Sequence, residues 1–385
     1  MRKDMSGVHP MRRLLQGDVG SGKTVVAACC ALMAIESGYH VALMAPTEIL
    51  AEQHFLNFCR WFKPLKIDVE LLTASHKTPG ARSMSPESTA TCSTLFIGTH
   101  ALIESGFNPA PLGLVIIDEQ HRFGVAQREE LVRKGQYPHL LVMTATPIPR
   151  TLGLTLYGEL DVSVMAQSPP GRGRIKTFVR SADKLPQVWD FIRSKLAQGR
   201  QAYVIYPRVE DTGDNGIKAV TREFDRVQQA LPDVRVGLLH GRLKAREKDG
   251  VMTLFRANDV QVLLATSLVE VGLDVPNATV MLIENAEQFG LAQLHQLRGR
   301  IGRGAHDSFC ILVAAVRTRE AQQRLRVLEE TTDGFKIAEA DLALRGPGEL
   351  LGQQQSGIPN FRFGNLATDF ELITRAREIA AQLLK

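Results

Sequence analysis

The stretch GDVGSGKT at residues 17–24 is the part of the sequence that decides the fold class. It fits the pattern G-x-x-x-x-G-K-[ST], follows the apolar run RRLLQG and precedes a helical pattern from about 23 to 37, which is the setting of a phosphate-binding loop. Glycines let backbone N–H groups curl around phosphate oxygens, and the start of the helix adds favourable dipole charge. The pattern predicts a nucleotide site made of Gly17, Asp18, Gly20, Ser21, Gly22, Lys23 and Thr24.

Two residues of this loop have separate expected roles. Lys23 should reach the β- and γ-phosphates of a nucleotide, and Thr24 should offer its hydroxyl to Mg²⁺. The alternative is a glycine-rich turn without a ligand, which the strand–loop–helix setting argues against.

A second motif, LVIIDEQH at 114–121, complements the loop. Four apolar residues end in two carboxylates at the carboxyl end of a predicted strand, where open α/β sheets bind ligands. Asp118 is expected to hold Mg²⁺, and Glu119 to orient or deprotonate the attacking water. Two carboxylates after a strand are also common as a solvated strand end, but together with Lys23 they indicate a nucleoside triphosphatase.

Apolar runs alternate with helical patterns along most of the chain. The runs after RRLLQG are HVALMAP, DVELLT, STLFIGTH, LGLVIIDE and HLLVMTATP and, beyond QSPPGRGR, IKTFVR, QAYVIYP, VRVGLLHG, VQVLLATS, ATVMLIENA and SFCILVAA. Short runs without strict alternation, separated by helices, indicate buried parallel strands with helices on both faces. We expect an α/β protein with two tandem parallel-sheet domains, 1–166 and 175–315, joined by a linker at 167–174 and followed by a mainly helical tail at 316–385.

Composition limits the broad class of the protein. A chain of 385 residues, 44% hydrophobic and 23% charged, suggests two globular units rather than disorder. The net charge of +5 is compatible with a nucleic-acid partner but too small to argue for one alone. Five cysteines without metal spacing predict neither a disulfide framework nor zinc. Without a long apolar run or an apolar signal core, we expect a cytoplasmic protein with no membrane partner.

Two further motifs point beyond a simple triphosphatase. TATPIPRT at 144–151 puts hydroxyls beside the acidic pair, although it could be an ordinary polar strand end. HQLRGRIGRG at 295–304 places Arg298, Arg300 and Arg303 on one segment whose glycines weaken a helix. A basic helix is usually a solvated face, but this segment is better suited to approaching a ligand closely. An arginine supplied across a domain cleft could stabilise charge on a γ-phosphate.

In this order, the motifs carry a family resemblance. GDVGSGKT, APTEILAEQH (45–54), GTHALI (98–103), DEQH, TATPIPRT, ATSLVEVGLDVPNA (265–278) and QLHQLRGRIGRG resemble those of superfamily 2 helicases, with both RecA-like lobes represented. More narrowly, the chain resembles the RecG family of bacterial ATP-dependent helicases, which remodel branched DNA. The resemblance covers nearly the whole chain from about Met11 onward.

The resemblance implies ATP and Mg²⁺ as cofactors and assigns further roles. It implies γ-phosphate sensing for Gln120 and His121, coupling of hydrolysis to lobe movement for Thr144 and Thr146, and arginine fingers at Arg300 and Arg303. It places Gly272 and Asp274 at the lobe interface near the nucleotide, and Pro46, Thr47, Thr99 and His100 against the DNA backbone. Backbone contacts of this kind predict salt-sensitive binding with little sequence preference.

The segment DLALRGPGELLGQQQSG at 341–357 lies beyond these motifs. It resembles the TRG motif, a helical hairpin and loop that follows the second lobe in RecG and Mfd and is needed for translocation. The resemblance assigns coupling to Arg324, Arg345 and Gln355. The alternative is a Gly/Pro loop that closes a helical tail.

The expected function is that of an ATP-dependent helicase or translocase that moves on duplex DNA and remodels stalled forks and Holliday junctions in recombination and repair. Three alternatives stay open: an Mfd-like transcription-repair coupling translocase, a truncated motor that binds DNA and nucleotide without productive unwinding, and a P-loop kinase or small-molecule ATPase, which does not explain the second lobe. Expected partners are duplex and branched DNA and, as a candidate, single-stranded DNA-binding protein; we expect a monomer.

The chain also departs from the family pattern. RecG carries an N-terminal wedge domain and an adenine-contacting motif, whereas about sixteen residues precede Gly17 here. We therefore expect the motor part of a longer protein, with weak preference for forked over linear DNA and poor discrimination between nucleotides.

Overall fold

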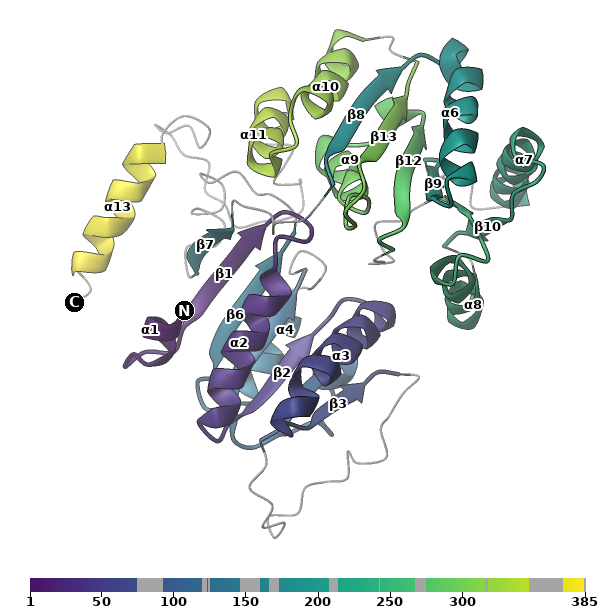
Figure 1. Ribbon diagram of the computed structural model, residues 1–385. Helices are drawn as coiled ribbons and strands as arrows, with labels where there is room; N and C mark the ends of the chain where they lie inside the picture. Colours follow the sequence, from purple (N-terminus) through teal and green to yellow (C-terminus); the bar gives the residue numbers. More distant parts are fainter. Residues whose placement is uncertain are drawn as a thin grey trace. The chain divides into compact units, whose positions relative to one another are not determined.

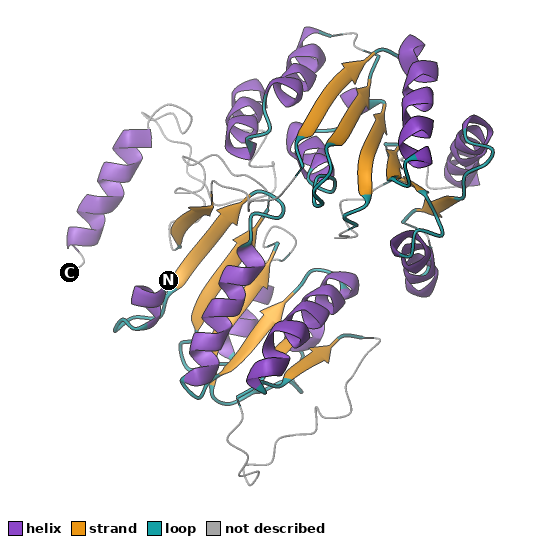
Figure 2. Cartoon of the chain, in the orientation of Figure 1, coloured by secondary structure: helices purple, strands orange, loops and turns teal. Residues whose placement is uncertain are grey.

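The chain is described from a computed structural model. The described residues are 1–74, 93–119, 123, 125–145, 160–165, 173–207, 214–241, 243–266, 275–315, 318–345 and 370–383. They form two compact units, Met1–Ser168 together with Gly357–Lys385, and Pro169–Ser356 (Figure 1). Each unit is built on a sheet of its own (Figure 2).

The sheet of the first unit has seven strands in the order β3-β4-β2-β5-β6-β1-β7. The strands are β1 (Arg12–Gly17), β2 (His40–Met44), β3 (Val69–Leu72), β4 (Leu95–Gly98), β5 (Leu112–Asp118), β6 (His139–Thr144) and β7 (Asp161–Met165). All paired strands run parallel. Their carboxyl ends therefore meet at one edge of the sheet, and β1 and β5, which carry the two predicted motifs, both end there.

Helices cover both faces of this sheet. The helices of this unit are α1 (Arg2–Met5), α2 (Lys23–Glu36), α3 (Glu48–Phe62), α4 (Val125–Arg133) and, at the C-terminus, α13 (Phe370–Leu383), with the short 3₁₀ turns η1 (Lys63–Leu65) and η2 (His100–Leu102). Helices α2 and α3 pack on one face with Val41 and Leu43, while α4 lies on the other with Ala42 and Met44 (Figure 1). Every residue of β2 is buried. Burial on both faces explains why these strands are continuous apolar runs rather than alternating ones.

The second unit repeats the plan with six parallel strands in the order β10-β11-β9-β12-β13-β8. The strands are β8 (Ile175–Arg180), β9 (Gln201–Ile205), β10 (Val236–Leu239), β11 (Val262–Ala265), β12 (Ala278–Glu284) and β13 (Ser308–Val313). The helices are α6 (Leu185–Ala197), α7 (Asp214–Ala230), α8 (Ala245–Arg256), α9 (Leu291–Arg298), α10 (Arg319–Glu330) and α11 (Gly334–Arg345), with η4 (Ala182–Lys184) and η6 (Ala286–Gln288). Helix α10 packs on β8, and α11 packs on α9 (Figure 1).

The predicted fold class is confirmed, since each predicted strand is present and the sheets are parallel. One strand was missed: β7 pairs with β1 at the edge of the first sheet. Its side chains are half-buried or exposed, so it lacks the apolar run that marks the central strands. The domain boundaries at 166, 175 and 315 stay predictions. Within the described parts of the chain, no helix is long and apolar enough to cross a membrane.

Candidate nucleotide site and its coupling elements

The phosphate-binding loop joins the end of β1 to the start of α2. Gly20 and Gly22 have φ of 75° and 98°, a backbone region that glycine enters without steric cost. A side chain at Gly17 would place its Cβ 2.6 Å from the Ser21 hydroxyl oxygen. The buried Lys23 amine donates to the carbonyl oxygens of Gly17 at 2.7 Å and Asp18 at 2.9 Å. The glycines are therefore required by the tight loop itself.

The same loop fits a bound phosphate chain. The hydroxyl oxygen of Ser21 is buried and has no hydrogen-bond partner among the described residues, and Gly22, the N-cap residue of α2, provides no side-chain cap. A buried hydroxyl without a partner is costly unless a ligand satisfies it. Because an uncapped helix start favours an anion, the loop has both the donors and the electrostatics that a nucleotide phosphate needs.

The acidic pair follows at the end of the neighbouring strand. Asp118 is the last residue of β5, and its register partner in β6 is Met143. Glu119 has φ of 51°, which costs a residue other than glycine on the order of 1 kcal/mol or more. One Glu119 carboxylate oxygen accepts a hydrogen bond from the Ala145 backbone N–H at 3.3 Å. The backbone after β6 thus contacts the predicted catalytic carboxylate directly.

Sequence reasoning missed a direct partner of Asp118. The His54 Nε2 atom on α3 lies 2.8 Å from Asp118 Oδ2, and both side chains are largely buried. Burial raises the pKa of Asp118, but the hydrogen bond from His54 and the charges of His54 and Lys23 outweigh it, so this pKa lies below its usual value. The only sequence signal was the histidine that ends APTEILAEQH. The carboxylate predicted to bind the metal is therefore held in its ionised form and contacted by a neighbouring helix.

The predicted DNA-contacting residues come from two neighbouring strand ends. Strands β2 and β4 pair in parallel with Met44 opposite Gly98, so the residues after them share the edge that carries the phosphate loop. Thr47 caps α3 by accepting from the Leu50 N–H at 3.3 Å. Pro46 is partly exposed and His100 is exposed, whereas the Thr99 side chain is buried. Their contacts with DNA stay predictions.

The three arginines of the second unit differ in their surroundings. Arg298, at the end of α9, is 2% exposed and donates to the Leu328 carbonyl at 2.8 Å and the Thr331 carbonyl at 2.9 Å. It holds helices together, so the expectation that all three arginines approach a ligand is wrong for this one. Arg300 and Arg303 follow the helix and are partly exposed; their role as arginine fingers stays a prediction.

The helical pair after the second sheet, α10 and α11, is attached at both ends of α9, the helix that precedes Arg300 and Arg303. Arg298 reaches the C-terminal end of α10, and the Arg324 guanidinium on α10 donates to the Glu287 carbonyl in η6 at 3.3 Å. Since η6 lies shortly before α9 and Arg298 is the last residue of α9, the two contacts lie at either end of this helix, which leads directly into the segment that carries Arg300 and Arg303. Helices α10 and α11 are therefore placed to move together with it.

Several predicted residues cannot be placed. Outside the described residues lie Gln120, His121, Thr146, Gly272, Asp274 and Gln355, as does the side chain of Arg345. Thr144 is buried at the end of β6 beside Gln16 of β1. Its role in coupling stays a prediction.

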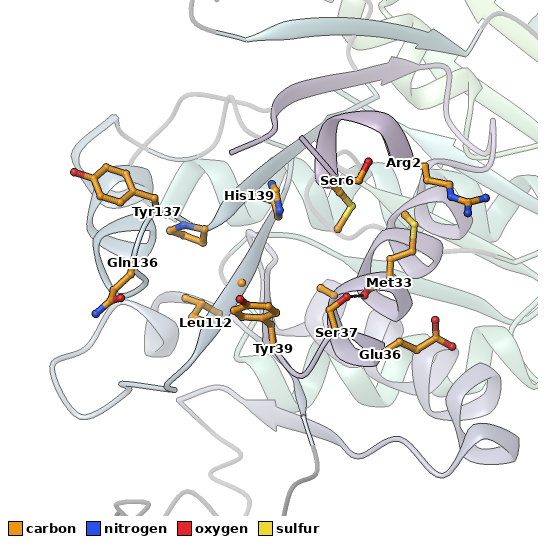
Figure 3. Close-up of a pocket in the computed structure, with 14 residues that line it drawn as sticks. Arg2, Ser6, Met33, Glu36, Ser37, Tyr39, Leu112, Gln136, Tyr137 and His139 are labelled. Carbon is orange, nitrogen blue, oxygen red and sulfur yellow. Dashed lines mark hydrogen bonds between the residues drawn. The ribbon is translucent and has the colours of Figure 1, made fainter. Parts of the chain in front are cut away.

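A cavity of about 490 Å³ in the first unit lies away from these residues. Figure 3 shows its lining, which includes Tyr39, Leu112 and His139. These residues lie at or next to the beginnings of β2, β5 and β6, at the edge of the sheet opposite the phosphate loop. The cavity is therefore separate from the candidate nucleotide site.

Family models match three consecutive parts of the chain. Residues 5–154 match "DEAD/DEAH box helicase", 183–305 match "Helicase conserved C-terminal domain", and 331–385 match "ATP-dependent DNA helicase RecG, domain 3, C-terminal". The ATP-dependent DNA helicase RecG of Synechocystis is 52% identical over 99% of the chain and 46% of its own length. That of Bacillus subtilis is 48% identical over 99% of the chain and 56% of its own length.

Solved structures agree with these matches. A RecG bound to a three-way DNA junction superposes with a TM-score of 0.76 at 42% identity, covering 97% of the chain and 48% of that structure. The chain matches the motor portion of RecG helicases. Dbp5 of S. cerevisiae bound to RNA and ADP BeF3 has a TM-score of 0.58 at 15% identity, covering 97% of the chain and 90% of its own, which shows the shared fold alone. The chain spans about half the length of the RecG relatives it matches.

Proposed function

We propose that the chain is an ATP-driven DNA motor that moves on duplex DNA and remodels branched DNA, such as stalled forks and Holliday junctions, in recombination and repair. The observation that carries this proposal is the meeting of the phosphate loop and the acidic pair at one sheet edge of the first unit. The match of residues 331–385 to a RecG-specific domain favours a RecG-type motor over an Mfd-like one.

The residues of the first unit have the chemistry that hydrolysis requires. ATP bound with Mg²⁺ supplies the phosphoanhydride bond whose hydrolysis drives the motor. Lys23 neutralises phosphate charge, Thr24 and Asp118 would hold the metal, and Glu119 orients the attacking water and takes its proton. The Ala145 N–H keeps the Glu119 carboxylate at the end of β6. Water activation is thereby linked to the backbone of the TATP segment.

The residues of the second unit supply the response to hydrolysis. Arg300 and Arg303 stabilise charge that develops on the transferred phosphoryl group. Helix α9, which leads into their segment, is held to the helical pair by the Arg298 hydrogen bonds at its end and by the Arg324 hydrogen bond to Glu287 before its start. A shift of the arginines on hydrolysis is thus passed to α10 and α11, and from there to DNA.

Further parts of the proposal rest on the family resemblance. They are the use of Mg²⁺ as the metal, work as a monomer in the cytoplasm, and contact with single-stranded DNA-binding protein. Branched DNA as a substrate is supported by the RecG structure on a three-way junction.

The nucleotide site is tested by Lys23→Ala. The substitution removes the cation that neutralises the phosphates, and we expect ATP hydrolysis to fall by at least about 10²-fold while the fold is kept. Lys134→Ala is the matched control, because the Lys134 amine also donates to two backbone carbonyls, those of Glu104 and Phe107, each at 2.7 Å. Hydrolysis retained in the Lys23 variant, measured by phosphate release, would refute the proposal.

A further inference from the structure

Helix α3 connects two regions that the mechanism treats separately. It begins at its cap residue Thr47, and His54 lies seven residues further on, about 10 Å along the helix axis. There the His54 ring meets Asp118 with 2.8 Å between Nε2 and Oδ2. The side chains are only 8% and 13% exposed, so little water competes for this contact.

The surroundings of His54 indicate that its ring has a polar role in addition to packing. The other buried residues of α3 are Ala51, Phe58 and Phe62, all apolar. A polar ring at such a position costs stability unless it is hydrogen-bonded. The buried His40 resolves the same problem differently, since its Nδ1 accepts from the Thr94 backbone N–H at 3.0 Å. His54 instead contacts the carboxylate that is expected to hold the metal.

The direction of the hydrogen bond follows from the partner. An ionised carboxylate only accepts, so the His54 ring donates from Nε2. This contact at Oδ2 fixes the orientation of the Asp118 carboxylate, which would hold the metal. Partners that orient a metal-binding carboxylate are worth about 10–100-fold in metal affinity or activity.

We propose that His54 is a positioning residue that fixes Asp118 for Mg²⁺ and ties the metal site to α3. The proposal rests on the proposed function, since it takes Asp118 as the metal ligand. The proposal also links two sites through α3. The cap residue of this helix, Thr47, is a predicted DNA contact, and His54 on the same helix contacts the predicted metal-binding carboxylate of Asp118.

Three variants of the full chain test this proposal. His54→Leu removes the donor at similar volume, His54→Gln keeps an N–H donor, and His40→Leu is the control for loss of a buried ring in the same lobe. Binding of Mn²⁺ in the presence of ADP is followed by electron paramagnetic resonance, and the Mg²⁺ concentration for half-maximal ATP hydrolysis is measured beside it. Thermal unfolding of each variant reports its stability.

The expected result separates positioning from structural support. His54→Leu should weaken Mn²⁺ binding about 10–100-fold and raise the Mg²⁺ requirement, while His54→Gln restores most of the affinity. His40→Leu should lower the unfolding temperature and leave Mn²⁺ affinity unchanged. Should His54→Leu bind Mn²⁺ as tightly as the unchanged chain, whatever its stability, the proposal is overturned. The same holds if His40→Leu weakens Mn²⁺ binding equally.

The outcomes also distinguish this proposal from the function it rests on. If the unchanged chain binds Mn²⁺ with ADP, and His54→Leu weakens that binding, but ATP is not hydrolysed, the positioning role stands and the motor function fails. If the unchanged chain and the His54→Leu variant hydrolyse ATP with the same Mg²⁺ requirement, the motor function stands and the positioning role fails. Absence of Mn²⁺ binding in the unchanged chain contradicts both.

Discussion

At the scale of single residues, Glu284 at the end of β12 is a buried acid outside the phosphate site. One of its carboxyl oxygens accepts from the Tyr206 hydroxyl at 2.6 Å. Burial and the nearby Glu223 raise the pKa of Glu284, and the Tyr206 hydrogen bond and the Arg226 charge oppose this only in part. The net shift is upward, so the folded protein favours the protonated acid.

This shift predicts a pH dependence of stability. A raised pKa means that the contribution of Glu284 is complete at acid pH and is lost as pH rises through its pKa in the folded protein. Glu284→Gln stays neutral, so we expect its free energy of unfolding to rise relative to the unchanged chain as the pH increases through the range above 4.5, the usual pKa of a glutamate. Urea denaturation in a Trp61→Phe background, where Trp189 alone reports, measures this. A constant difference across this range would contradict the prediction, and Glu330→Gln is the exposed control.

The site residues that could be predicted from the sequence are those positioned by elements close to them in the chain. Lys23 and Asp118 lie in short motifs, and the strand and loop that position them are adjacent in the sequence. The His54 contact with Asp118 joins residues 64 positions apart, and the positive φ of Glu119 arises where β5 ends beside β6. Neither follows from spacing, because each depends on which strands and helices become neighbours.

At the scale of elements, the order of strands and helices was readable because two-sided burial produces continuous apolar runs. Strand β7 was not predicted, because an edge strand whose side chains are half-buried or exposed carries no such run. The role of Arg298 was also hidden: the sequence shows a basic segment, but only the packing of α10 against α9 shows that this arginine is internal.

The attachment of α9 to α10 predicts a large stability effect. Arg298→Ala leaves the carbonyls of Leu328 and Thr331 without their charged donor, and we expect the second unit to lose about 3 kcal/mol. Arg326→Ala is the matched control, since Arg326 pairs with Glu330 on the surface and should cost less than about 1 kcal/mol. Urea denaturation followed by Trp189 fluorescence in the Trp61→Phe background compares them. Equal losses would show that Arg298 does not join the helices.

At the scale of the whole molecule, the chain combines two parallel-sheet units with different tasks. The first carries the phosphate loop, the acidic pair and the predicted DNA-contacting residues at one sheet edge. The second carries the arginine segment and the helical pair attached to it. We expect ATP hydrolysis to be faster when DNA is bound, because the predicted DNA-contacting residues and the phosphate loop share one sheet edge.

The most direct test of this account is the rate of ATP hydrolysis by the unchanged chain without DNA, with linear duplex DNA and with a three-way junction. We expect both DNAs to raise the rate, the stimulation to fall as salt is increased because the contacts are to phosphates, and Lys23→Ala to abolish the activity in all three conditions. A rate that is the same with and without DNA at low salt would contradict the claim that the chain is a DNA motor.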